Sequence, residues 1–193
     1  MTNSALVVID MQNDFIDGAL GSVEAQKIVS KVRQCIEEFD GKAIYATMDN
    51  HYPENYKEFA EGREIPEHCM NDTEGEKLEP TIEAALYSRQ YGKPGSPPEG
   101  VAYFHKEAFG SLTLANVLYE DVEDYDINTI YIVGLCTDIC VLSNALMLRA
   151  ACPRANIVVF EDCCAGSSLE NHYNALRLME INCITIDKYQ LDF

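Results

Sequence analysis

The sequence predicts a three-layer αβα sandwich built on a six-stranded, mostly parallel sheet. Short apolar runs alternate with longer segments of helical periodicity, and no change in composition divides the 193 residues. Parallel strands need crossover connections, and helices on both faces then cover the apolar sheet. We therefore expect one α/β domain over residues 1–193.

The apolar runs give the strands, and the segments between them give the helices. The expected strands are Ala5–Ile9, Ala43–Thr47, Val101–Phe104, Thr129–Val133, Asn156–Phe160 and Cys183–Ile186. Apolar residues recur at helical spacing in Glu24–Phe39, Glu79–Tyr87, Ser111–Leu118, Asp138–Ala151 and Ser168–Glu180. Gly95–Pro98 is expected to be a turn or loop.

Charge and cysteine content narrow the classes of function. The formal net charge of −18 argues against binding to nucleic acid or to an anionic membrane, which needs a positive surface. The opening Met1–Ser4 lacks the pattern of a signal peptide, so we expect the eight cysteines to be reduced thiols. No window approaches the roughly 18–20 apolar residues of a membrane span. We expect a cytoplasmic protein that acts on a small molecule.

Cys140 is the most informative single residue. It follows the Thr129–Val133 strand and Gly134, at the start of the next helix. Thr137 or Asp138 can cap that helix, whose dipole and free N–H groups would lower the pKa of the thiol and hold an oxyanion. The alternative is a small buried apolar residue, as most cysteines are. Spacing alone leaves both interpretations open.

Two more reactive groups also stand at strand ends. Asp10 directly follows Ala5–Ile9, and Lys106 follows closely after Val101–Phe104. The carboxyl ends of parallel strands form the ligand crevice of an open sheet, so these groups are expected to converge with Cys140. Singly, such an aspartate is usually a cap and such a lysine a solvated charge, but together they favour a catalytic site.

A second group of polar residues follows the Ala43–Thr47 strand. Asp49 and His51 come first, and Glu61 and His68 lie in a loop-like stretch after them. Two imidazoles with one or two carboxylates suit a divalent metal such as zinc, iron or manganese. Loop histidines are usually only exposed, so composition alone does not decide for a metal.

These motifs resemble those of the isochorismatase-like cysteine hydrolases, and among them the nicotinamidases. The resemblance rests on Val7–Phe15, Lys106 and Gly134–Val141, which follow the order and spacing of that family and span nearly the whole chain. It implies a triad of Asp10, Lys106 and Cys140.

The resemblance also implies further roles and features. A non-proline cis peptide bond is expected at Leu135–Cys136. The backbone amides of Cys136 and Cys140 would form an oxyanion hole. The implied substrate pocket contains Phe15, Leu135 and Tyr103.

The implied metal ligands are Asp49, His51 and His68, with zinc as the first candidate. Some relatives use a glutamate at the place of Glu61, which makes it a further candidate ligand. Glu58 and Glu64 are nearby competitors.

The activity implied is hydrolysis of nicotinamide to nicotinate and ammonia, a reaction of NAD salvage, through a cysteine thioester. The metal would orient the pyridine ring. One departure bears on the substrate, because many relatives have tryptophan beside the Asp-x-His motif, whereas this chain has Asn50 there and no tryptophan. Relatives are commonly dimers or larger, so a homo-oligomer is an expectation from the resemblance alone.

Two other functions stay open. One is an amidase of the same superfamily that acts on a carbamoyl or ureido substrate, with Asp49 and His51 structural. The other is a non-catalytic domain that binds a small ligand or senses oxidants through Cys140 and Cys136.

Overall fold

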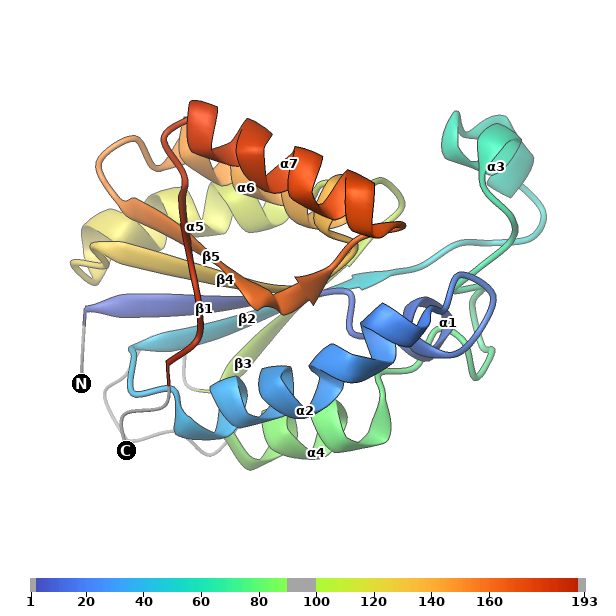
Figure 1. The fold of residues 1–193 in the computed structure, drawn as a ribbon, viewed down its shortest axis with the longest axis horizontal. Helices are drawn as coiled ribbons and strands as arrows, with labels where there is room; N and C mark the ends of the chain where they lie inside the picture. Colours follow the sequence, from blue (N-terminus) through green and yellow to red (C-terminus); the bar gives the residue numbers. More distant parts are fainter. Residues whose placement is uncertain (1–2, 90–99, 191–193) are drawn as a thin grey trace.

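The computed structural model describes residues 3–89 and 100–190, and its architecture is the predicted three-layer α/β sandwich (Figure 1). Six strands form one sheet in the order β3-β2-β1-β4-β5-β6, and each neighbouring pair is parallel. The prediction of the fold class is therefore confirmed. The expected turn at Gly95–Pro98 lies outside the described residues.

All the predicted strands are present: the first four are one or two residues longer than predicted, and the last two differ more. They are β1 Ser4–Ile9, β2 Ala43–Asp49, β3 Val101–Lys106, β4 Thr129–Leu135, β5 Asn156–Ala165 and β6 Thr185–Asp187. The last begins later than predicted because Cys183 has a φ of 61° and belongs to the turn before it. The fifth continues beyond Phe160 as far as Ala165, which brings its end to the carboxyl edge of the sheet.

Helices cover both faces of the sheet, as Figure 1 shows. On one face lie α5 Leu112–Asp124, α6 Leu142–Ala151 and α7 Leu169–Ile181, and on the other lie α2 Val23–Glu38 and α4 Pro80–Arg89. Serine side chains cap three of them by accepting the N–H three residues later; these are Ser22, Ser111 and Ser168. No helix in the described ranges is long and apolar enough to cross a membrane.

Three short elements were not predicted. They are α1 Asn13–Ile16, η1 Tyr56–Glu58 and α3 Glu61–Glu64. Each is about one turn long, so none shows the repeated apolar spacing from which a helix is predicted. Their loops extend past the carboxyl ends of the strands, where they build part of the site described below (Figure 1).

The alternation of side chains along each strand divides the core in two. In β1, Ala5, Val7 and Ile9 pack in the cluster under α5, α6 and α7. Leu6 and Val8 pack in the cluster under α2 and α4. The face on which a strand residue lies therefore decides which layer of helices it contacts.

The direction in which successive strands are added to the sheet reverses between β1 and β4. β2 and β3 extend from one side of β1, whereas β4, β5 and β6 extend from the other. Such a reversal leaves a crevice at the carboxyl ends of the two central strands. Asp10 follows the first of these strands and Cys136 follows the second.

Gly134 lies where β4 approaches β1 most closely. Its φ is 123°, and a Cβ atom added there would overlap the backbone of Ile9. We expect Gly134→Ala to lower the free energy of unfolding by about 2–4 kcal/mol, because the two central strands must separate to admit the methyl group. Urea denaturation measures this loss.

Gly110→Ala is the matched control. The nearest atom to its added Cβ would be Sδ of Met147, in a flexible side chain that can move aside. We expect a loss below about 1 kcal/mol. Equal losses in the two variants would contradict the assignment of a special backbone role to Gly134.

Candidate active site

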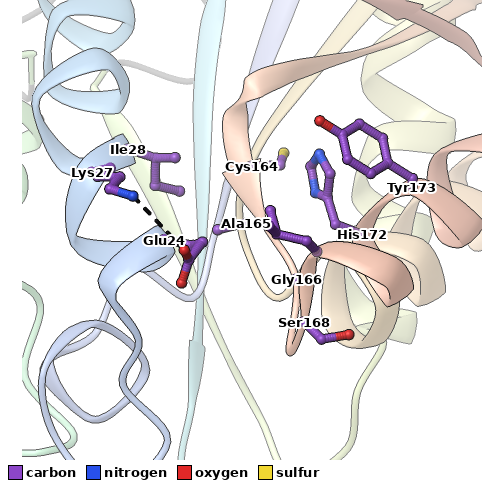
Figure 2. Close-up of a pocket in the computed structure, with 10 residues that line it drawn as sticks. Glu24, Lys27, Ile28, Cys164, Ala165, Gly166, Ser168, His172 and Tyr173 are labelled. Atoms are coloured by element: carbon purple, nitrogen blue, oxygen red, sulfur yellow. Dashed lines mark ion pairs between the residues drawn. The ribbon is translucent and has the colours of Figure 1, made fainter.

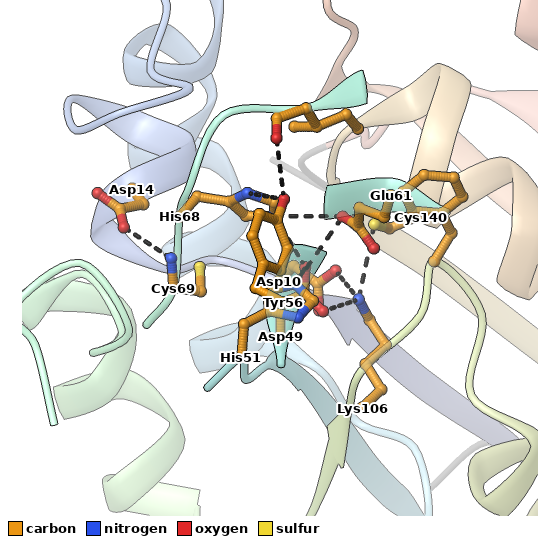
Figure 3. Close-up of polar contacts among 12 residues, drawn as sticks. Asp10, Asp14, Asp49, His51, Tyr56, Glu61, His68, Cys69, Lys106 and Cys140 are labelled. Atoms are coloured by element: carbon orange, nitrogen blue, oxygen red, sulfur yellow. Dashed lines mark hydrogen bonds and ion pairs between the residues drawn. The ribbon is translucent and has the colours of Figure 1, made fainter. Parts of the chain in front are cut away.

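Four side chains from four strand ends meet at the carboxyl edge of the sheet (Figure 3). Asp10 follows β1, Asp49 ends β2, Lys106 ends β3, and Cys140 lies in the turn after β4. Lys106 Nζ is 2.7 Å from Asp10 Oδ2 and 3.1 Å from Asp49 Oδ1. It also donates to Cys140 Sγ at 3.6 Å. The convergence expected from strand ends therefore occurs.

The backbone at Asp10 directs its carboxylate into this group. Its φ of 46° is left-handed, a conformation that aspartate tolerates better than most residues, and it breaks the regular alternation of β1. Thr47 Oγ1 donates to Asp10 Oδ1 at 2.6 Å, and the Asp10 N–H donates to the Thr47 carbonyl at 3.2 Å. One carboxylate oxygen is thus held by Thr47 and the other by Lys106.

Burial sets the electrostatics of the triad. It raises the pKa of Asp10, although the charge of Lys106 and the Thr47 hydroxyl oppose this. Burial also raises the pKa of Cys140 well above its ordinary value. The expectation of a lowered thiol pKa is therefore wrong, because desolvation outweighs the charge of Lys106. The arrangement is a protonated thiol beside a carboxylate that can accept its proton.

Burial alone would lower the pKa of Lys106. The charges of Asp10, Cys140 and Asp49 outweigh that effect and raise the pKa well above its ordinary value. The ammonium group therefore stays charged.

Cys140 lies in η2, a π-helical turn over Thr137–Val141 that precedes α6. Neither expected cap caps a helix. Thr137 Oγ1 is 2.8 Å from His172 Nδ1, and the Asp138 carboxylate accepts from the N–H and hydroxyl of Ser167 at 2.8 and 2.6 Å. The capping prediction is wrong because Thr137 bonds to α7 and Asp138 bonds to the segment between β5 and α7.

A second cluster shares Asp49 with the first. Asp49 Oδ2 is 3.3 Å from His51 Nε2 and 3.3 Å from His68 Nε2. Glu61 Oε1 is 3.3 Å from His68 Nε2 and 3.9 Å from His51 Nε2. One ligand atom from each of the four residues lies within 4.8 Å of the others, and all four residues are buried.

This donor set fits a divalent cation. His51 Nε2 is buried yet makes no hydrogen bond of good geometry to Asp49 Oδ2, as befits a nitrogen that faces a shared ion. Burial alone would lower the pKa of His68, but Asp49 and Glu61 raise it to about 10, so the cluster favours positive charge. Two imidazoles and two carboxylates are ligands that zinc accepts.

Burial distinguishes Glu61 from the two competing glutamates. Glu58 and Glu64 are exposed, whereas the Glu61 side chain is only 7% exposed and faces both histidines. Glu61 is therefore the glutamate that the structure brings to the cluster.

Gln12, which the sequence pattern did not single out, holds Asp49 in place. Its amide nitrogen donates to the carbonyls of Asp49 and Glu76 at 2.8 and 2.7 Å. Its amide oxygen accepts from the Asp49 N–H at 2.7 Å. Gln12 stands two residues after Asp10 in the Val7–Phe15 motif, but its role depends on contacts distant in sequence.

Two more missed residues support the histidines. The Tyr56 ring lies 4.8 Å from the His51 ring, and its hydroxyl is 3.3 Å from His68 Nδ1. Asp14 Oδ2 accepts from the N–H of Cys69 at 2.7 Å, directly after His68. No local pattern marks Tyr56, whereas Asp14 lies in the motif that carries the resemblance.

The expected pocket residues have different outcomes. Phe15 is buried, with its ring 5.2 Å from that of His68. Leu135 is buried at the end of β4, and the Leu135–Cys136 peptide bond is cis, as the resemblance implies. Tyr103 lies three positions before Lys106, so it is on the opposite face of β3 and packs in the cluster under α2 and α4. Phe15 and Leu135 pack in the same cluster, so the place of Tyr103 in the pocket stays a prediction.

Comparison with known proteins agrees with this geometry. A model of the isochorismatase domain matches residues 4–188. The chain belongs to the isochorismatase family. This isochorismatase-family chain is 26% identical to the nicotinamidase of Escherichia coli (strain K12), over 99% of its own length and 96% of the relative's.

Two solved structures share the fold and part of the sequence. A pyrazinamidase of Pyrococcus horikoshii in complex with zinc is 28% identical, with a TM-score of 0.74 over 97% of this chain and 100% of the other. An N-carbamoylsarcosine amidase from Thermoplasma acidophilum is 26% identical, with a TM-score of 0.75 over 100% of both chains. These similarities place this isochorismatase-family chain among the amide-bond hydrolases.

Replacement of Gln12 tests its role beneath Asp49. We expect Gln12→Leu to lower the free energy of unfolding by about 2–4 kcal/mol, because it leaves buried backbone groups of Asp49 without partners. Asn13→Ala, which removes an exposed hydrogen bond to the Glu74 carbonyl, should cost less than about 1 kcal/mol. Urea denaturation of both variants measures the difference, and equal losses would refute the role of Gln12.

Proposed function

We propose that this isochorismatase-family enzyme is a metal-dependent nicotinamidase, which hydrolyses nicotinamide to nicotinate and ammonia through a thioester on Cys140. The proposal rests on the carboxylate of Asp49, which is shared between the two clusters. Asp49 Oδ1 pairs with Lys106, while Asp49 Oδ2 faces His51 and His68. A triad suited to amide hydrolysis thus adjoins a donor set suited to a cation, which matches a substrate with both a carboxamide and a ring nitrogen.

In the first half-reaction, Asp10 takes the proton from Cys140 and the sulfur attacks the amide carbon. The carbon–nitrogen bond then breaks, and Asp10 gives the proton to the departing ammonia. A carboxylate oxygen of Asp10 and Sγ of Cys140 lie within 4.8 Å of each other. Catalytic hydrogen bonds that are long in the free enzyme tighten when substrate binds. The backbone N–H groups of Cys136 and Cys140 stabilise the oxyanion, where one donor contributes about 3–4 kcal/mol.

In the second half-reaction, Asp10 takes a proton from water as the water oxygen attacks the thioester. The carbon–sulfur bond breaks, the proton on Asp10 returns to the Cys140 sulfur, and the acid formed releases its carboxyl proton to solvent and leaves as nicotinate. Lys106 contacts both Asp10 and Cys140, so its charge stabilises the anion on either residue. A base with a raised pKa suits this cycle, because Asp10 must both accept and release a proton.

The second cluster would hold the metal ion. Asp49, His51, Glu61 and His68 are the ligands that we assign, with zinc as the first candidate. When bound, such an ion supplies a Lewis acid for the pyridine nitrogen. Phe15, packed against His68, offers an apolar surface beside the same position.

A carbamoyl or ureido amidase is the second candidate. It is favoured by the absence of tryptophan and by the similarity to the N-carbamoylsarcosine amidase. Asn50, the middle residue of the Asp-x-His motif, is buried and bonded to Glu76, and its amide offers no aromatic wall. Ammonia release from nicotinamide and from an N-carbamoyl amino acid, at matched concentrations, separates the two candidates.

Removal of the thiol tests the mechanism. We expect Cys140→Ala to reduce turnover of nicotinamide by a factor on the order of 10⁴ or more, because no nucleophile remains. Cys183→Ala removes an exposed thiol and should leave turnover unchanged. Ammonia release from both variants is the measurement. Full turnover by Cys140→Ala would refute the thioester, whereas an active N-carbamoyl reaction without nicotinamide turnover would refute only the substrate.

Removal of an imidazole tests the metal site. After dialysis against zinc, we expect about one ion per chain in the unaltered protein and at least about tenfold weaker binding in His68→Ala. His105→Ala, an exposed histidine outside the cluster, should bind as the unaltered protein does. Elemental analysis and competition with a chromogenic chelator measure the affinity. Unchanged binding in His68→Ala would exclude His68 as a ligand.

A further inference from the structure

A cavity of about 270 Å³ lies between α2, the end of β5 and the start of α7 (Figure 2). None of its lining residues belongs to the triad or to the proposed metal cluster. Its apolar walls come from Ile28, Ala165, Leu169 and Tyr173, and Glu24, Lys27 and His172 add polar groups. A dry cavity of about 150 Å³ can hold a benzene molecule, so this one has room for a single substituted ring.

The lining indicates the chemistry of the ligand. The rings of His172 and Tyr173 stand edge to face at 5.1 Å, and Tyr173 is 62% exposed at the wall. Lys27 supplies an ammonium group whose ion pair with Glu24 is long, at 3.8 Å. α7 begins at Leu169, which places the positive end of its dipole in the same wall. An aromatic ring matches the apolar walls, and one carboxylate would face the start of α7 and replace the Glu24 carboxylate beside Lys27.

The cavity wall is joined to the turn that carries Cys140. His172 Nδ1 bonds to Thr137, the first residue of η2. Ser167, which links β5 to α7, bonds twice to Asp138. Gly166 also lines the cavity and lies close to Asp138, because a Cβ added to it would be 2.8 Å from Asp138 Oδ1.

We propose that this cavity binds a small single-ring carboxylate and that occupation of the cavity restrains the η2 turn. Both binding and restraint are independent of the reaction proposed above. Nicotinate belongs to this ligand class, and its role as a product that acts back on Cys140 rests on the proposed function.

The imidazole of His172 gives the restraint a chemical route. Burial lowers its pKa, so the ring is neutral near neutral pH and carries one N–H. A carboxylate that accepts from Nε2 fixes the proton there, and Nδ1 must then accept from the hydroxyl of Thr137. The ligand thereby selects the direction of the hydrogen bond to the turn.

A single tryptophan reports on binding. Leu169 is 60% exposed and lines the cavity, and the chain has no tryptophan, so Leu169→Trp gives an unambiguous fluorescence signal. We expect saturable quenching by benzoate and none by benzamide. In this background Lys27→Gln should weaken benzoate binding about fivefold, the value of one exposed ion pair. Arg33→Gln, which breaks an exposed ion pair with Glu37 on the same helix, should leave binding unchanged.

Each other result overturns a stated part of the proposal. Absence of saturation by benzoate would exclude the site. Equal quenching by benzamide, or no effect of Lys27→Gln, would exclude recognition of a carboxylate.

Hydrogen exchange on the unaltered protein tests the restraint. Benzoate should slow exchange at residues 164–173 and also at residues 137–141. Protection of 164–173 alone would exclude transmission to the turn. Because this readout needs no turnover, it holds even if nicotinamide proves not to be the substrate.

Discussion

The buried ammonium group of Lys106 is the interaction on which the catalytic end of the sheet depends. Its side chain is only 3% exposed, and a charge so buried is stable only when it is paired, here with Asp10 and Asp49. Those carboxylates stand at the carboxyl ends of β1 and β2, so the pairing needs the register that sets Asp49 opposite Lys106. A slip of one residue would turn Lys106 to the other face. The register of the sheet and the buried charges therefore determine each other.

The sequence predicted the strands and the converging residues well, because apolar runs reveal where parallel strands end. It failed where the backbone leaves regular geometry. The π-helical turn at Thr137–Val141 is shaped by bonds to Ser167 and His172, which no local pattern contains.

The proposed metal cluster illustrates the limit of local information. Asp49 and His51 were recognisable at a strand end, but Glu61 lies on a helix of one turn with no apolar period. Only burial separates Glu61 from its neighbouring glutamates. The loop is further shaped by Gln12 and Tyr56, whose contacts reach it from elsewhere. Resemblance to a family supplied candidates here that residue patterns alone left undecided.

The order of strands in the sheet has a consequence for synthesis of the chain. β1 pairs with β4 along its whole length, yet β4 leaves the ribosome long after β1, β2 and β3. Until then β1, which is wholly buried in the finished protein, is the edge of an incomplete sheet. An apolar edge with unpaired backbone groups pairs readily with other chains. The nascent protein is therefore most prone to aggregation in the interval that ends when β4 docks.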